Sequence, residues 1–245
     1  MNLILLDERD RLDAGRVTLA DGRAAHVLNV LKVTPGQTVR VGSLDGPLGV
    51  GTVESVGVGR VTMRCVFEAQ APPRPRVDLL LALPRPKVMR RLWAQLAALG
   101  VGRIILTNAE RVERPYFDTH VLAEAHFRPL LVEGLQQARD TRLPAVSIHR
   151  QFKVLVEDHL DGFSDEALRL VADPLAATSV ASAIGDRQDR RVLIAIGPEG
   201  GWNAFELALL QAHGFRSVGL GPRTLRVDTA CTALLAIVHA SLEAT

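Results

Sequence analysis

Two glycine-rich loops carry the residues best suited to chemistry. The first, IGPEGGW, spans Ile196 to Trp202 and places the carboxylate Glu199 among three glycines after an apolar strand. The second, LGPRTLRVDTA, spans residues 220–230 and carries two arginines and an aspartate. Glycine lets a ligand approach backbone amides closely, and ligands of open α/β sheets bind beyond the carboxyl ends of strands. IGPEGGW matches neither GxGxxG nor GxxxxGK[ST], so nucleotide-phosphate binding of the familiar kind is not indicated there.

Each loop also has a purely structural interpretation. IGPEGGW alone is equally compatible with a tight turn and with a ligand loop. Asp228 precedes a predicted helix, where a carboxylate is favourable through the helix dipole alone. The arginines Arg223 and Arg226 could simply be solvated. Two strand–Gly-Pro–loop–helix units in succession instead favour two loops lying side by side at one sheet edge, which would make a binding site.

The elements that must position these loops alternate between strands and helices. Several strands are apolar on both faces, which is typical of a parallel sheet covered by helices on both sides. We therefore predict an α/β domain over residues 73–245. The predicted strands are 77–83, 101–106, 146–149, 168–172, 192–196 and 217–220, and the predicted helices are 87–99, 119–139, 203–212 and 229–242.

Residues 1–72 show a different sequence pattern. Short alternating segments at 38–41, 49–56 and 60–67 are separated by frequent turn residues, with a short helix expected near 26–31. This pattern predicts a small β-barrel or sandwich. The proline-rich stretch 71–76 cannot continue a strand or a helix and is predicted to link two domains.

Composition excludes several classes of protein. The 245 residues carry a net charge of only +2, so nucleic-acid binding must depend on local clusters. Cys65 and Cys231 stand far apart without metal-ligand neighbours, and no HExxH occurs, so we expect no metal site. The first apolar run breaks at Asp7, too early for a signal peptide, and no stretch is long enough to span a membrane. These features predict a cytoplasmic protein.

The paired loops resemble a known family. IGPEGGW followed by LGPRTLRVDTA is similar to the C-terminal motifs of the SPOUT superfamily of RNA methyltransferases. More narrowly, it resembles the bacterial 16S rRNA uracil-N3 methyltransferases, whose motifs read approximately GPEGG and LGxRILRxETA. The elements Leu99-Gly100-Val101 and Glu110-Arg111 and the segment EGLQQARDTRLP, residues 133–144, extend the likeness.

The resemblance implies a knotted α/β methyltransferase domain behind a PUA-like RNA-binding β-barrel, acting as a homodimer on 16S rRNA or the small ribosomal subunit. S-adenosylmethionine would lie bent in the knot loops. The residues expected to contact it are Ile196, Gly197, Pro198, Glu199, Gly200, Gly201, Leu220, Gly221, Leu225, Thr229 and Ala230.

The reaction needs a group that manages the proton of the uracil imide. Because N3 must lose this proton before it attacks, positive charge that stabilises the imide anion would assist. Arg226 is the first candidate and Arg223 the second, while Asp228 could orient an arginine or accept the proton. Asp228 replaces the family's glutamate and is one methylene shorter. Glu199 could hold a loop or touch the ribose hydroxyls.

Two basic clusters are candidates for RNA contact. The first groups four cations at a predicted helix start, where they oppose the helix dipole unless a phosphate is near; it comprises Arg85, Lys87, Arg90 and Arg91. Arg139 and Arg142 form the second, although cations at a helix C-terminus are favourable by themselves.

The last helix, 229–242, is apolar on nearly all sides, which fits a core helix or a dimer interface. Two other functions remain open. One is a SPOUT methyltransferase acting on tRNA or a ribose hydroxyl, and the other is a non-catalytic RNA-binding or assembly factor with the same fold.

Overall fold

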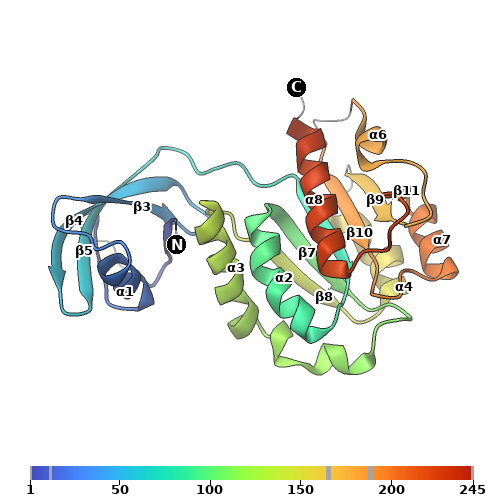
Figure 1. The fold of residues 1–245 in the computed structure, drawn as a ribbon, viewed down its shortest axis with the longest axis horizontal. Helices are drawn as coiled ribbons and strands as arrows, with labels where there is room; N and C mark the ends of the chain where they lie inside the picture. The colour runs from blue at the N-terminus through green and yellow to red at the C-terminus, as the bar shows by residue number, and fades with distance from the viewer. Residues whose placement is uncertain (1, 11–12, 164–166, 187–189, 244–245) are drawn as a thin grey trace. The chain divides into compact units, whose positions relative to one another are not determined.

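A computed structural model describes residues 2–10, 13–163, 167–186 and 190–243, and the chain divides into two compact units (Figure 1). The first unit comprises Met1–Arg74 and Val132–Leu143, and the second comprises Pro75–Leu131 and Pro144–Thr245. The second unit is thus interrupted in sequence by a short segment that packs with the first.

The first unit is built on a curled, mixed five-stranded sheet in the order β1-β3-β4-β5-β2. Strand β1 runs parallel to β3, whereas the other neighbours are antiparallel. Its elements are β1 (Ile4–Leu6), β2 (Arg16–Leu19), α1 (Gly22–Asn29), β3 (Thr38–Ser43), β4 (Leu48–Gly57) and β5 (Arg60–Phe67). The predicted strands at 38–41, 49–56 and 60–67 are confirmed, and the helix begins four residues before the predicted start because Asp21 caps it.

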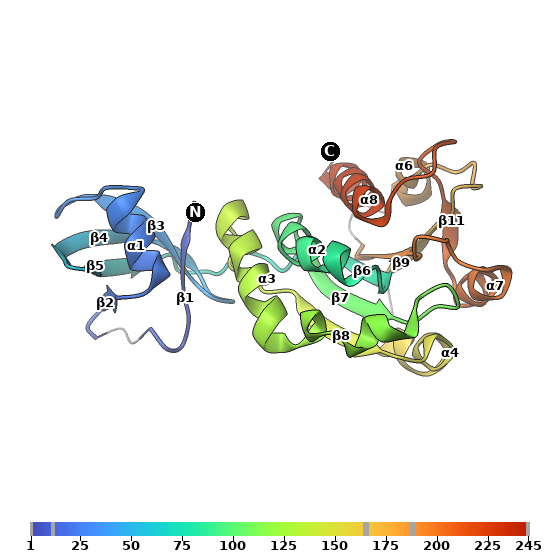
Figure 2. The same cartoon turned by 60° about the horizontal axis from the view of Figure 1, so that its bottom comes forward.

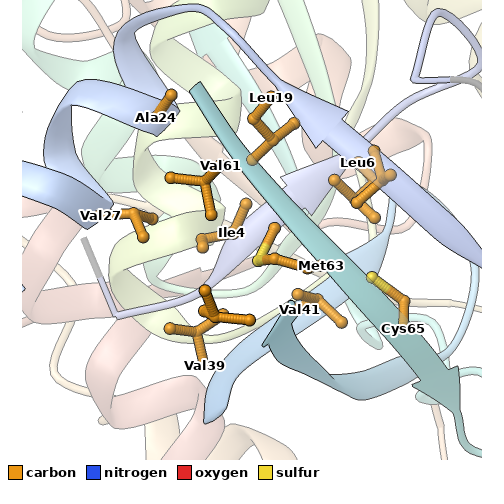
Figure 3. Packing of buried hydrophobic residues seen from close by; sticks show 12 residues of the cluster. Ile4, Leu6, Leu19, Ala24, Val27, Val39, Val41, Val61, Met63 and Cys65 are labelled. Atoms are coloured by element: carbon orange, nitrogen blue, oxygen red, sulfur yellow. The ribbon is translucent and has the colours of Figure 1, made fainter. Parts of the chain in front are cut away.

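One face of this sheet forms the core of the first unit. Side chains alternate between the two faces of a strand, so every second residue of β3 and β5 points inward. Figure 3 shows these residues packed with α1. The cluster contains Ile4, Leu6, Val17, Leu19, Ala24, Val27, Val39, Val41, Val53, Val61, Met63 and Cys65.

The second unit contains a six-stranded sheet in the order β11-β9-β10-β6-β7-β8. All its pairings are parallel, which confirms the predicted parallel sheet. The strands are β6 (Val77–Ala82), β7 (Val101–Thr107), β8 (Ala145–His149), β9 (Leu168–Ala172), β10 (Val192–Ile196) and β11 (Arg216–Val218). Strands β6 and β10 are buried throughout, as expected for central strands with helices on both sides.

Helices cover both faces of this sheet. Figure 2 shows α2 (Pro86–Ala98) and α8 (Val227–Glu243) on one face, with α4 (Phe152–Val154) on the other. A π-helical turn (Leu155–His159) and α5 (Leu160–Phe163) continue from α4, and α7 (Ala204–Ala212) packs on the same cluster. The remaining helices are α3 (Glu124–Ala138) and α6 (Val180–Ile184).

Two predicted helices need correction, and two helical segments were not predicted. The helix expected over 119–139 begins only at Glu124, because residues before it form 3-10 turns at Arg114–Asp118 and His120–Leu122. The last helix begins at Val227 rather than 229, which places Asp228 inside its first turn. The helical segment 152–163 and α6 were not predicted, since both are short.

The strand order places the first loop at a topological switch point. After β6 the chain proceeds to β7 on one side, and after β10 it proceeds to β11 on the other side. Ligands of open α/β sheets bind where the strand order reverses in this way. The two glycine loops, however, do not follow neighbouring strands, because β9 lies between β10 and β11. The two predicted units are therefore separated by one strand in the sheet, and the expectation that their loops lie side by side stays a prediction.

Candidate active site

The first loop, after β10, is a tight turn. The Gly201 amide donates to the Pro198 carbonyl at 2.8 Å, and Gly201 has a φ of 72°, a conformation that favours glycine. Ile196, Gly197 and Pro198 are buried, whereas Glu199 and Gly200 are exposed. The loop thus has a fixed base and presents its carboxylate to solvent.

Glu199 connects this loop to the start of α2. Its Oε1 accepts a hydrogen bond from the Arg85 amide at 3.2 Å. Arg85 is the N-cap of α2 and makes no side-chain cap of its own. The carboxylate therefore lies near the positive end of the helix dipole and accepts from the N-cap amide, which orders the loops after β6 and β10 together.

Two further contacts bring in the loop after β7. The Arg111 guanidinium donates to the Gly200 carbonyl. The buried carboxylate of Glu206 accepts from the Glu110 amide at 2.7 Å and from the Asn203 amide at 2.8 Å. The Asn203 Oδ1 in turn accepts a hydrogen bond from the Glu206 amide at 2.8 Å, which completes the capping box of α7. The loops after β6, β7 and β10 are thus joined by backbone-directed hydrogen bonds.

The second loop, after β11, lies against the loop after β9. The Gly219 amide donates to the Thr178 carbonyl at 2.9 Å, and a Cβ at Gly219 would collide with the Ala176 carbonyl. Beside this contact lies a cavity of about 500 Å³. Its lining is Pro174, Ala176, Ala177, Ser179, Val180, Ala181, Gly219, Leu220, Gly221, Pro222 and Ile237.

Of the residues predicted to hold the cofactor, Leu220 and Gly221 line this cavity. Leu225 is exposed farther along the same loop, and Thr229 and Ala230 belong to the first turns of α8. The residues of IGPEGGW lie in the loop after β10, which is joined to the loops after β6 and β7. The sequence missed the loop after β9, although the Asp173-Pro174 pair directly after a strand is a turn signal that could have indicated it.

The three predicted catalytic side chains differ in their surroundings. Arg223 and Arg226 are exposed, and neither makes an ion pair or side-chain hydrogen bond with another described residue. Asp228 is only partly exposed, and its Oδ2 accepts from the Arg91 guanidinium at 2.8 Å. Its Oδ1 accepts from the Thr229 amide at 3.0 Å. The carboxylate is therefore held in place, while the two arginines have no partner in the part of the chain that the structure describes.

The basic cluster at the start of α2 is exposed at all four positions, Arg85, Lys87, Arg90 and Arg91. Arg91 is the member paired with Asp228. No acidic residue lies in the first turn of α2. The unfavourable interaction between this positive charge and the helix dipole is therefore only partly relieved, by Glu199 and Asp228.

Arg139 and Arg142, by contrast, lie in the first unit. The Arg142 side chain donates to the Pro72 carbonyl at 2.5 Å and to the Asp45 carbonyl at 2.7 Å. Arg139 is exposed and has no such contact with another described residue. Of this pair, Arg139 has the guanidinium that is more available to a ligand.

The sequence did not indicate two further residues near the first loop, Tyr116 and Glu113. The Tyr116 hydroxyl donates to Glu113 at 2.8 Å. Burial, and after it the hydrogen bond to the Glu113 carboxylate, raises the pKa of Tyr116. A lone tyrosine on a 3-10 turn gives no sequence signal.

The described ranges contain neither a cluster of metal ligands nor a long apolar helix. No group of three or more His, Cys, Asp or Glu side chains there could hold a metal ion. Among the same residues, none of the helices is long and apolar enough to cross a membrane.

Comparison with known proteins identifies the family. A family model described as an RNA methyltransferase domain matches residues 71–239, more than half of the chain. Ribosomal RNA small subunit methyltransferase E of Treponema pallidum is 30% identical, over 100% of this chain and 92% of the relative. Ribosomal RNA small subunit methyltransferase E 1 of Borreliella burgdorferi is 25% identical over 99% of both chains.

A solved structure shows the same fold. The crystal structure of a ribosomal RNA small subunit methyltransferase E from Neisseria gonorrhoeae, bound to S-adenosyl methionine, matches with a TM-score of 0.76. The sequences are 22% identical, and the match covers 98% of this chain and 97% of that one. With the motif loops at the carboxyl edge of a parallel sheet and relatives aligned from end to end, the chain belongs to the ribosomal RNA small subunit methyltransferase E family of RNA methyltransferases.

Proposed function

We propose that this protein transfers a methyl group from S-adenosylmethionine to N3 of a uridine in the 16S rRNA of the small ribosomal subunit. The observation that carries the proposal is the end-to-end match to ribosomal RNA small subunit methyltransferase E, which includes both glycine loops. The positions of these loops around a switch point of the parallel sheet support the same assignment.

The cavity beside the second loop fits the cofactor. Its volume of about 500 Å³ lies within the range of about 300–1,000 Å³ usual for small-molecule sites. Leu220 and Gly221 would hold the cofactor from one side, and the loop after β9 would hold it from the other. Gly219 lets these two loops approach each other closely, because a Cβ there would collide with the Ala176 carbonyl. When bound, the sulfonium of S-adenosylmethionine supplies a methyl group already activated for transfer.

The protein must then stabilise the uracil imide anion. Arg226 and Arg223 are suited to this role because their guanidinium groups are exposed and lack carboxylate partners among the described residues. Asp228 is less suited to accept the proton, because its oxygens already accept from Arg91 and from the Thr229 amide. We assign Asp228 to positioning and Arg226 to anion stabilisation.

The second unit is proposed to contain the trefoil knot of SPOUT enzymes. The bond between Gly219 and Thr178 supports this, because it holds the chain after β11 against the loop after β9. The first unit, with its mixed sheet and single helix, is proposed to be the PUA-like RNA-binding domain, with the division near residue 72. We expect the protein to act in the cytoplasm without a metal ion.

A homodimer is proposed from the outer face of α8. Thr232, Ala236, Ile237 and Ala240 are exposed there, whereas the other face of the helix is buried. Small and apolar side chains at this spacing form a flat surface suited to close packing of a second copy. Light scattering of the intact protein tests this: Ala236→Glu should yield monomers, and Ala240→Ser should remain dimeric.

The reaction is tested with purified small ribosomal subunits and labelled S-adenosylmethionine. We expect 3-methyluridine in the 16S rRNA. Arg226→Ala should lower kcat by about a hundredfold or more, as removal of one anion-stabilising donor does elsewhere, with cofactor affinity little changed. Arg216→Ala, at another exposed arginine of the second unit, is the control. Methylation elsewhere would refute the assignment, and equal loss of rate and cofactor affinity would move Arg226 to cofactor binding.

A further inference from the structure

A second cavity lies wholly within the first unit, away from the glycine loops in sequence. Its volume is about 690 Å³, and it lies where β1 and β3 meet the α1–β3 loop. The lining residues are Asn2, Leu3, Ile4, Leu31, Val33, Gly36, Gln37, Thr38, Val39, Arg40 and Arg139. The cavity thus combines an apolar wall, several amide and hydroxyl groups, and two arginines.

The charge around the cavity is positive and unpaired. Arg40 and Arg139 line it, and Lys32 lies in the chain between the lining residues Leu31 and Val33. None of these three cations makes an ion pair or side-chain hydrogen bond with another described residue. Elsewhere in the same sheet, the arginines Arg16 and Arg64 are both paired with Glu54. The cavity should therefore attract anions more strongly than the surface around Arg16, Arg64 and Glu54.

Backbone geometry marks the same place. Lys32 has a φ of 52° and Arg139 a φ of 62°, so both occupy the left-handed region that disfavours side chains. Arg139 follows the end of α3, and the next amide, Asp140, donates to the Leu135 carbonyl at 3.0 Å. That bond makes Arg139 the C′ residue of a Schellman motif, a position usually filled by glycine. Two basic residues in unfavourable conformations beside one cavity indicate a role beyond folding.

The polar groups are arranged for a nucleotide. Gln37, which lines the cavity, uses its Oε1 to accept from the Thr34 amide, so its Nε2 remains as a donor. Asn2 donates its Nδ2 to the Gln137 carbonyl, which leaves Oδ1 as an acceptor. Leu31 and Val33 offer an apolar surface for the face of a base. An unpaired nucleotide presents this combination of phosphate, base edge and flat ring, whereas a duplex hides the ring.

We propose that this cavity binds one unpaired nucleotide of the RNA substrate, with its phosphate at Arg40 and Arg139 and its base against Leu31 and Val33. The inference rests on the proposed function and gives it a specific RNA contact. It also separates the two arginines predicted at the end of α3. Arg139 faces the nucleotide, and Arg142 holds backbone carbonyls within the unit.

The test is fluorescence anisotropy of a labelled single-stranded RNA oligonucleotide with the full-length protein. Arg40→Ala and Arg139→Ala should each weaken binding by about tenfold. Each should also reduce the slope of log affinity against log salt by about 0.7, the value for one phosphate contact in a single strand. Arg60→Ala is the control, because Arg60 is an exposed arginine of the same sheet that does not line the cavity. Circular dichroism confirms that each variant is folded.

Three outcomes would overturn the proposal: the two variants bind like Arg60→Ala, the same sequence as a duplex competes as well as the single strand, or the wild-type protein binds no oligonucleotide. Methylation of small subunits is measured in parallel. Wild-type binding that depends on Arg40 and Arg139 without any methylation would leave the cavity assigned and refute the proposed reaction. Normal methylation, together with RNA binding by both variants that equals wild type, would support the proposed reaction and refute the assignment of the cavity.

Discussion

Arg139 presents a conflict between stability and binding that one substitution can measure. Its φ of 62° costs an ordinary L-residue roughly 1–2 kcal/mol. Glycine removes this cost but makes the unfolded chain more flexible, which costs about 0.4–1 kcal/mol. We therefore expect Arg139→Gly to raise the free energy of unfolding by about 0.5–1 kcal/mol. Nothing is lost from packing, because the side chain is exposed.

Arg139→Ala is the matched control for this effect. Alanine keeps the Cβ and therefore the cost of the left-handed conformation, so its stability should stay within about 0.5 kcal/mol of wild type. Both variants remove the guanidinium and should weaken RNA binding equally. Only the glycine variant should gain stability, seen as a higher urea midpoint and a melting temperature higher by about 2 °C.

The comparison can fail in two informative ways. If Arg139→Gly were no more stable than Arg139→Ala, the left-handed conformation would not carry the expected cost. If the glycine variant retained wild-type RNA affinity, the guanidinium would not contact the nucleotide, and the Schellman position would need another explanation. A urea titration of both variants, read by circular dichroism, decides the first question, and anisotropy decides the second.

Three further results are expected. Glu199→Gln should keep the hydrogen bond from the Arg85 amide, because a glutamine side chain also offers an oxygen acceptor. Its affinity for the cofactor, measured by calorimetry, should therefore equal that of wild type. A large loss of affinity would show that the negative charge itself is needed. Burial raises the pKa of Asp78, so the stability that this group contributes is lost as pH rises above the usual value of 3.8. The urea midpoint of Asp78→Asn, which also lacks the pair with Arg191, should therefore rise relative to that of wild type as pH increases from 3.8, and the opposite trend would refute the sign. Burial also raises the pKa of Cys65 to about 11 and of Cys231 to about 12, so native protein should not react with a thiol reagent at about pH 8 until unfolded.

The parallel sheet was predictable because its central strands are continuous apolar runs, as residues 77–82 and 192–196 are. The capping signal of Asn203 and Glu206 likewise fixed the start of α7. The strand order was not predictable, since hydrophobic runs do not encode which strands are neighbours. That is why β9 and its loop came as an unexpected partner of the second glycine loop.

The cavity in the first unit was beyond sequence reasoning for a different reason. Arg40 lies on β3 and Arg139 follows α3, so about a hundred residues separate them, and only tertiary folding brings them to one cavity. Arg139 itself gave a misleading signal, because a cation at a helix C-terminus is favourable without any ligand. Its left-handed φ and its place on the cavity wall can be read only from the folded structure.

The pairing of Arg91 with Asp228 changes how the charges of the active site should be counted. Sequence reasoning placed Arg91 with RNA and Asp228 with catalysis, but a distance of 2.8 Å makes them one unit with little net charge. The side chain of Asp228 reaches Arg91 although it is one methylene shorter than the glutamate of the family motif. Because the acid is neutralised by Arg91 on α2, Arg223 and Arg226 keep their full positive charge for the uracil anion. A base at Asp228 would have to break that pair first, which is why we assign the chemistry to the arginines and the positioning to the aspartate.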